Sequence, residues 1–384
     1  MMAVEEDSRR GGSNTGSRVS LAATVRSKKR GDSEHANRYL CAYLLQNQNG
    51  RQLHYHDADC GKDYGSSRFG NYLMRWYLTR YIASQANATL TGSCKVSQGM
   101  IPQTNLRPQD LVMDDQTMGG ANKPSWQEIC SLCLSNVTKV SDMCVFPHGV
   151  VGTADDTSTT TINMAYMVPT IRKDMKGLLQ GVLQQTPQLE EEMDDVAIHL
   201  RLGDVGSISS GRYGLVPFSV YVKYVDELVI PFVDSEPFTI GIVTAPFQQH
   251  RGRHRPNNPH FNQAVVEAAT DFLRSKYPKA TVTIRNSAQD THNVVFARLL
   301  GAKKLLFCAP STFCLVPALG RASPKHSIMV QSTLFGSSSS NLGWLGTVQE
   351  SSSDGAFRYV KESLITSTQL QQMSIDKVVE TLSS

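Results

Sequence analysis

The sequence predicts an α/β protein in which parallel sheets carry helices on both faces. Three observations support this fold class. Strand-like and helical segments alternate from about residue 170 to residue 331, which is the order of elements in a parallel sheet with crossover helices. The strand-like segments are β-branched or continuously apolar, as expected of strands that are buried on both faces. The chain has 384 residues, of which 40% are hydrophobic and 19% charged, so it can bury a large core.

The individual elements follow from the spacing of apolar residues. Strand-like segments such as Val196–Leu202 and Phe238–Val243 are short and mostly apolar, whereas the helical segments are longer and repeat apolar residues every three or four positions. In chain order we expect a helix over 170–193, a strand over 196–202, a helix over 217–232, a strand over 238–243, a helix over 260–276, a strand over 280–284, a helix over 290–300, a strand over 304–308, a short helix over 312–319 and a strand over 327–331.

The N-terminal part divides into a polar tail and a first domain. Residues 1–38 are rich in Ser, Gly, Arg and Lys, and we expect them to be disordered because they cannot offset their ordering entropy. The first domain, over 39–168, should begin with a strand near Tyr39–Leu45. Further along, Asn71 can cap a helix. That helix is predicted from apolar residues at helical spacing, namely Leu73, Trp76, Tyr77, Tyr81 and Ile82.

The C-terminal part is expected to hold a second domain followed by helices. The second domain covers 169–335, where strands and helices alternate most clearly. Residues 336–356 are rich in Ser and Gly and are predicted to form a loop. Residues 357–384 are predicted to be helices that pack back across the domain boundary.

Composition and motifs exclude several classes of protein. The net charge of +4 is too small to indicate nucleic-acid binding over the whole surface. No run of about 18 apolar residues predicts a spanning helix, and no N-terminal signal peptide is recognisable. An NAD-dependent enzyme is disfavoured because no G-x-G-x-x-G follows a predicted strand.

The eight cysteines could be free thiols, disulfides or metal ligands, and their number alone does not distinguish these. An even count suits disulfides but does not fix their pairing. Cys130-Ser-Leu-Cys133 has the spacing of half a zinc site, yet no second pair of ligands completes it. We therefore expect ordinary thiols or disulfides and no metal site.

Two segments place polar side chains beyond the carboxyl ends of strands, where ligands bind in an open parallel sheet. In the first, His199 and Arg201 lie two residues apart on one strand and so face the same side. A buried guanidinium needs a partner, and its planar fork matches a phosphate. Two interpretations stay open: Arg201 binds an anion, or it pairs with Asp204 and only stabilises the turn.

The second segment is Ala309-Pro-Ser-Thr-Phe313, which joins an apolar strand to a helix. Backbone N–H groups at a helix N-terminus bind anions, and the hydroxyls of Ser311 and Thr312 add donors. In the alternative interpretation, Ser311 simply caps the helix. The two segments together favour a phosphate site more strongly than either one does alone.

Three segments resemble motifs of a known family. Val196-Ala-Ile-His-Leu-Arg-Leu-Gly-Asp204 is similar to an H-x-R-x-G or H-x-R-R-x-D motif. The stretch from Phe296 to Phe313 is similar to a later helix and strand that end in a Ser-Ser/Thr-Phe turn, and Arg68-Phe-Gly-Asn71 is similar to a glycine-containing turn near the start of a catalytic region. The family is the GDP-fucose-dependent fucosyltransferase superfamily, with its protein O-, α1,6- and α1,2-fucosyltransferases. The resemblance covers roughly residues 65–330.

The resemblance implies a fold and a set of site residues. The fold is the GT-B arrangement, two Rossmann-like domains facing a cleft, with the donor nucleotide mostly on the C-terminal domain. Arg201 matches the arginine that contacts the donor phosphate and is the implied catalytic residue. The other implied donor-binding residues are His199, Ser311, Thr312, Phe313, Gly70, Asn71 and, as the nearest candidate for an acidic position, Asp290.

The implied activity is transfer of fucose, or a similar sugar, from GDP-fucose to a hydroxyl of a glycan or protein, with inversion at the sugar. Negative charge grows on the leaving diphosphate, and Arg201 with the backbone donors near Ser311 would neutralise it. No Asp-x-Asp pair stands at a strand end to hold a metal, so a metal-independent mechanism without a cofactor is favoured.

Departures from the family pattern keep an alternative open. The helix entry Asp290-Thr-His-Asn293 carries its acid a few positions away from the usual place, and Thr244-Ala-Pro246 lacks an acid that is common in relatives. A general base is not indicated. The alternative is a catalytically idle module that binds a nucleotide sugar or a glycan. The resemblance implies the Golgi or endoplasmic reticulum, reached through a membrane anchor that this chain does not show, and a cytoplasmic location is the alternative.

Overall fold

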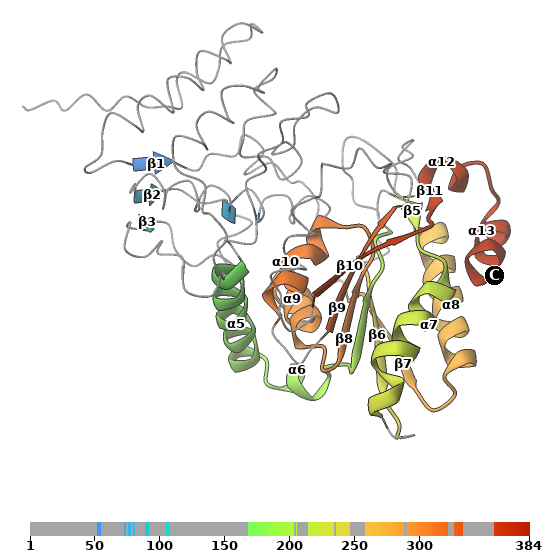
Figure 1. Cartoon of the computed structure of the whole chain (residues 1–384), viewed down its shortest axis with the longest axis horizontal. Coiled ribbons are helices and arrows are strands. Elements are labelled where there is room, and N and C mark those ends of the chain that lie inside the picture. Colours follow the sequence, from blue (N-terminus) through green and yellow to red (C-terminus); the bar gives the residue numbers. More distant parts are fainter. Residues whose placement is uncertain are drawn as a thin grey trace, which may run out of the picture.

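The computed structural model describes most of the chain from residue 168 onward and short pieces before it (Figure 1). The described residues are 52–54, 73, 76, 77, 80, 89–91, 105–106, 168–202, 205, 214–233, 236–245, 258–287, 290–321, 326–332 and 357–384.

A six-stranded parallel sheet forms the centre of this part of the chain. The strands lie in the order β10-β9-β8-β4-β6-β7. Counted along the chain, this is the doubly wound order 3-2-1-4-5-6, in which the winding direction reverses between β4 and β8. The strands are β4 (Val196–His199), β6 (Thr239–Val243), β7 (Thr281–Arg285), β8 (Leu305–Cys308), β9 (His326–Ser332) and β10 (Phe357–Glu362).

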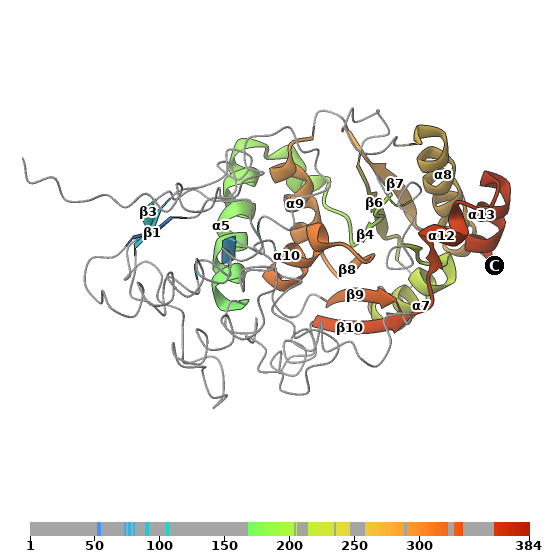
Figure 2. The ribbon, with the colours of Figure 1, turned by 90° about the horizontal axis from the view of Figure 1, so that it is seen from above.

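Helices cover both faces of the sheet, as the sequence predicts (Figures 1 and 2). One layer consists of α5 (Val168–Gln185), α9 (His292–Gly301) and α10 (Thr312–Gly320), which pack against one another. The other layer consists of α7 (Phe218–Leu228), α8 (Pro259–Lys276) and α13 (Ile375–Ser383). The fold is therefore α/β and Rossmann-like over this region.

The core lies between the central strands and the α7–α8 layer. Every residue of β4 and β8 is buried, which explains their continuous apolar sequence. The Tyr221 ring of α7 meets the Phe307 ring of β8 edge to face, with centroids 4.8 Å apart. Burying one such large side chain contributes about 1.5–3 kcal/mol, so these strands are held firmly while their carboxyl ends carry polar residues.

Two predicted helices are shorter than expected because prolines interrupt them. The helix expected over 170–193 divides into α5 and α6 (Gln188–Glu191), with Pro187 between them. The helix expected over 217–232 ends at Leu228, and the 3₁₀ turn η7 (Ile230–Phe232) follows with a proline in its first positions. A proline has no N–H to donate and clashes with the preceding turn, so it kinks or ends an α-helix. The helices end at these two prolines, whereas α10 accommodates Pro317.

The C-terminal helices predicted over 357–384 begin later than expected. Residues 357–362 instead form β10, which pairs in parallel with β9, because an aromatic and β-branched segment gains more from a strand ladder than from a helical turn. The short strand β11 (Ile365–Thr366) then pairs with β5 (Gly214–Leu215). Helices follow only as α12 (Ser367–Leu370) and α13. The six-stranded sheet therefore includes a strand from beyond residue 335.

The described pieces of the N-terminal half support part of the prediction. Leu73, Trp76 and Tyr77 are helical and buried, as predicted. On the same stretch, Arg80 donates to the Asp174 carboxylate of α5 at 2.6 Å. A small sheet joins β1 (Gln52–His54), β2 (Thr89–Thr91) and β3 (Asn105–Leu106).

Several expectations fall outside what the structure describes. They are the tail over 1–38, the strand at 39–45, the pair Cys130 and Cys133, and the loop over 336–356. The first domain, expected over 39–168 as a Rossmann-like unit, lies largely outside the described residues as well. The GT-B arrangement therefore stays a prediction.

Gly241 of β6 is a position where the fold tolerates no side chain. A Cβ atom there would lie 2.6 Å from Cγ of the Asp194 side chain, which crosses the strand at this point. We expect Gly241→Ala to lower the free energy of unfolding by about 2–3 kcal/mol through this overlap. Chemical denaturation of the full chain measures the change.

Gly181 in α5 provides the matched control for this substitution. A Cβ atom there meets nothing within 4 Å, so Gly181→Ala should instead stabilise the helix, by about 0.5–1 kcal/mol. Equal effects of the two substitutions would contradict the close approach of Asp194 to β6.

Candidate functional site

The two predicted polar segments lie side by side at one edge of the sheet. His199 ends β4 and stands level with Cys308, which ends β8. The backbone N–H of Ala309 then donates to the carbonyl oxygen of His199 at 3.3 Å. The winding direction of the sheet reverses between these two strands, and ligands of doubly wound folds bind in the crevice at that point. The sequence alone predicts that both segments lie at this edge of the sheet. The strand order shows that they are neighbours at the point where the winding reverses.

Arg201 links the two segments. It lies just beyond β4, and its Nη1 donates to the carbonyl oxygen of Pro310 at 3.2 Å. The side chain is partly buried, and its guanidinium carries five N–H donors in a fixed planar fork. Asp204 lies outside the described residues, and the alternative that it pairs with Arg201 therefore stays open.

His199 is a buried polar side chain at the same edge. It is 6% exposed, and its ring stacks on the Phe313 ring with centroids 5.6 Å apart. Within the described part of the chain, its Nδ1 atom has no hydrogen-bond partner. Burial, with the nearby positive charge of Arg201, lowers the pKa of His199 to about 3, so the imidazole is neutral at physiological pH. A buried nitrogen without a partner is costly and would gain from a polar ligand atom.

Aromatic rings fix the position of Phe313. The Phe296 ring of α9 meets it edge to face, with centroids 4.7 Å apart. The His292 ring, at the first residue of α9, lies 6.4 Å from it. Phe313 thus stands among three rings from β4 and α9. The sequence marks Phe313 as a site residue but does not predict this aromatic cluster, because ring contacts depend on how α9 packs beside α10.

Ser311 and Thr312 open helix α10. Ser311 occupies the N-cap position, but its side chain makes no capping hydrogen bond. The alternative interpretation of Ser311 as a simple helix cap is therefore not what the structure shows. Ser311 is 7% exposed and directly precedes the first turn of α10, where backbone N–H groups have no partner within the helix itself. These groups give the edge a set of donors suited to an anion.

A disulfide that the sequence leaves unassigned closes this segment. Cys308, the last residue of β8, is bonded to Cys314 in the first turn of α10. The loop that it closes contains Pro310, Ser311 and Phe313, the residues that contact or adjoin Arg201 and His199. The signal in the sequence is that two cysteines flank the Ala-Pro-Ser-Thr-Phe turn.

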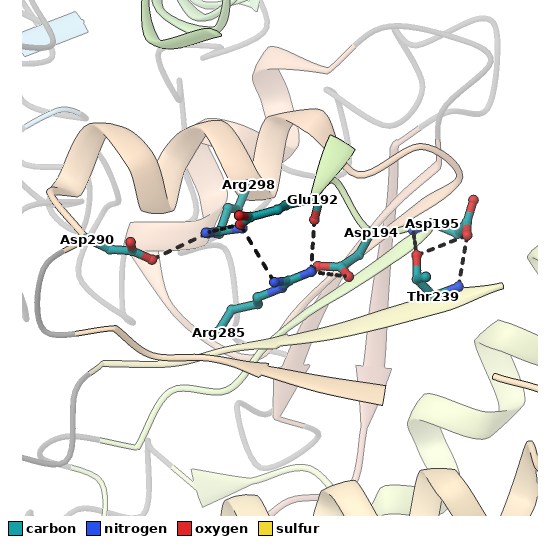
Figure 3. Close-up of polar contacts among 7 residues, drawn as sticks. All are labelled: Glu192, Asp194, Asp195, Thr239, Arg285, Asp290 and Arg298. Atoms are coloured by element: carbon teal, nitrogen blue, oxygen red, sulfur yellow. Dashed lines mark hydrogen bonds and ion pairs between the residues drawn. The ribbon is translucent and has the colours of Figure 1, made fainter. Parts of the chain in front are cut away.

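Asp290 belongs to an ion-pair network beneath α9 (Figure 3). Its carboxylate lies 3.4 Å from Nε of Arg298, and Nη2 of Arg298 also lies 2.9 Å from the Glu192 carboxylate. The network continues through Arg285, whose Nη2 lies 3.0 Å from the Asp194 carboxylate. The structure thus gives Asp290 a structural partner at the entry to α9. Within the described part of the chain, the ion-pair partner of Asp290 is therefore Arg298 of α9 and not a residue of β4 or α10.

The remaining predicted positions divide into two groups. Gly70 and Asn71 lie outside the described residues. Thr244, at the carboxyl end of β6, is 4% exposed, and its hydroxyl has no partner among the described residues. A buried hydroxyl thus occupies the position after β6 that carries no acid in this chain.

Comparison with known proteins adds no assignment: no family model, no curated protein and no solved structure matches the chain. Over the described ranges, no helix is both long and apolar enough to cross a bilayer. Over the same ranges, no three His, Cys, Asp or Glu side chains gather in a way that could hold a metal ion.

Proposed function

We propose that the chain is a glycosyltransferase that moves fucose, or a similar sugar, from GDP-fucose to a hydroxyl of a glycan or protein. The diphosphate would bind at the carboxyl ends of β4 and β8. The GT-B arrangement belongs to this proposal, with the N-terminal half carrying Gly70 and Asn71 as the second wall of the cleft. The proposal also places the protein in a compartment of the secretory pathway, where such donors are used.

One observation carries the proposal: Arg201 donates to the carbonyl oxygen of Pro310, next to the N-terminus of α10. This contact lies where the winding direction of the sheet reverses between β4 and β8. A guanidinium and a set of backbone N–H groups at one edge form a donor set that suits a diphosphate. The neutral His199, with an unpaired Nδ1 atom in the described part of the chain, adds a polar contact at the same place.

The chemistry of sugar transfer fits this donor set. Cleavage of the bond between the sugar and the diphosphate leaves negative charge on the phosphate and an electron-poor sugar carbon. Arg201 would stabilise the leaving group by electrostatic attraction and needs no reorganisation to do so. The acceptor hydroxyl would attack from the opposite side, which inverts the configuration of the sugar.

A ligand series tests the donor assignment. GDP and GDP-fucose should raise the melting temperature of the full chain in EDTA, whereas GMP and guanosine should raise it much less because they lack the second phosphate. UDP serves as the control for recognition of the base. No shift with any guanine nucleotide would remove GDP-fucose as the donor.

A catalytically idle module is the second candidate, and one observation favours it. Asp290, the nearest acidic candidate for donor binding, is engaged by Arg298, so its carboxylate already has a structural partner. Incubation with GDP-fucose and an acceptor array distinguishes the two candidates. Release of GDP that depends on the acceptor supports the transferase, whereas tight binding without release on any acceptor supports the idle module.

A further inference from the structure

We propose that the Cys308–Cys314 disulfide is a positioning element of the site. It would hold the turn from Ala309 to Phe313 in its binding shape before any ligand arrives. This inference rests on the proposed function only for the identity of the ligand. That the bond shapes the turn can be tested without a ligand.

The geometry of the turn is the first argument. The two cysteines are six residues apart and their Cα atoms are 5.7 Å apart, a separation typical of disulfides. One is anchored in the central strand β8 and the other in α10. The bond therefore fixes the distance between a strand end and a helix start, and the turn between them carries the groups that adjoin Arg201.

The second argument compares the disulfide with the non-covalent contacts of the turn. Backbone bonds run from Ala309 N–H to the His199 carbonyl and from Leu315 N–H to the Ser311 carbonyl, each 3.3 Å long, and aromatic rings pack around Phe313. The Ser311 side chain adds no cap. Arg201 contributes one bond to Pro310, but that guanidinium also has to serve the ligand. The covalent link is therefore the strongest constraint described for this segment.

The third argument is burial. Cys308 and Cys314 are both 0% exposed, so a reductant in solution has no direct access to the sulfur atoms in the folded protein. A buried, short-range disulfide is suited to a permanent structural role and unsuited to rapid switching. We therefore assign it to positioning and not to redox regulation.

Formation of the bond requires an oxidant. The two thiols lose two protons and two electrons, and a disulfide of the glutathione type takes them up and becomes two thiols. Such bonds form and persist in oxidising compartments, so this inference also favours maturation of the chain in the secretory pathway.

Peptide mapping tests the bond itself, independently of ligand. The full chain is unfolded and alkylated without reductant and is then digested with trypsin, which should release Leu305–Arg321 with both cysteines. We expect this peptide to be unalkylated and lighter than the dithiol form by two hydrogen atoms. An alkylated peptide from protein folded under oxidising conditions would overturn the inference.

A double variant tests the positioning role. Cys308→Ala with Cys314→Ala should lower the melting temperature by about 5 °C, the effect of opening a small loop. It should also weaken GDP binding about tenfold and speed amide hydrogen exchange across 309–313. Unchanged exchange over 309–313 would overturn the positioning role, and so would unchanged GDP affinity.

A matched control separates positioning from general destabilisation. Val378 of α13 is fully buried in the opposite helix layer, so Val378→Ala should also lower the melting temperature but leave GDP affinity and exchange at 309–313 unchanged. If the unmodified protein binds no nucleotide, the proposed function fails, whereas the mapping and exchange results still decide the role of the disulfide.

Discussion

Arg201→Ala is expected to weaken GDP binding about 100-fold, because the variant loses charge-assisted, bidentate contacts to the diphosphate worth about 3 kcal/mol. The guanidinium already contacts Pro310 beside the N-terminus of α10, so it stands at the proposed phosphate position without rearrangement. Isothermal titration with GDP in EDTA measures the effect. In the unliganded protein, loss of the hydrogen bond to Pro310 should cost about 1 kcal/mol of stability.

Two further arginine variants make this result specific. Arg201→Lys keeps the charge but loses the planar fork, so its affinity should fall between those of the wild type and the alanine variant. Arg274→Ala removes a guanidinium from the far end of α8, where the side chain is 57% exposed, and it should bind GDP normally. Equal losses in the Arg201 and Arg274 variants would indicate general electrostatic attraction and contradict a phosphate site at Arg201.

The second large effect is a dependence of stability on pH that comes from His199. Its pKa is about 3 in the folded protein because of burial and, to a lesser degree, Arg201, whereas an unfolded histidine has a pKa of about 6.5. Between these values the unfolded chain binds a proton that the folded chain does not. The contribution of His199 to the free energy of unfolding is therefore complete above pH 6.5. It is lost as the pH falls toward 3, by about 1.4 kcal/mol per pH unit.

A non-titrating variant isolates this contribution. His199→Phe removes the titration and keeps a ring to pack against Phe313. The difference in unfolding free energy between wild type and variant should shift by about 2 kcal/mol between pH 7 and pH 5, with the wild type losing more on acidification. Carboxylates elsewhere cancel in this comparison. A difference that stays constant over this range would mean that His199 is not held neutral in the folded state.

The sequence by itself determined the elements of the C-terminal half and the edge at which its polar residues lie. The continuous apolar sequences of strands such as Val196–His199 and Leu305–Cys308 indicate burial on both faces. Polar residues follow them directly. Because the carboxyl ends of parallel strands meet at one edge, His199, Arg201 and Ser311 could be assigned to it from local sequence alone. The prolines that shorten two helices were equally visible, but the predicted helix lengths overlooked them.

Only the tertiary structure decided which strands are neighbours and which side chains meet. Strand order places β8 beside β4 and brings Pro310 to Arg201 across 109 positions of sequence. The pairing of Cys308 with Cys314 and the use of residues 357–362 as a sixth strand also depend on packing. The physical reason is that hydrophobic periodicity records whether a residue is buried, whereas strand pairing, ring contacts and the environment of a buried ionisable group depend on which segments, distant in sequence, are packed around it.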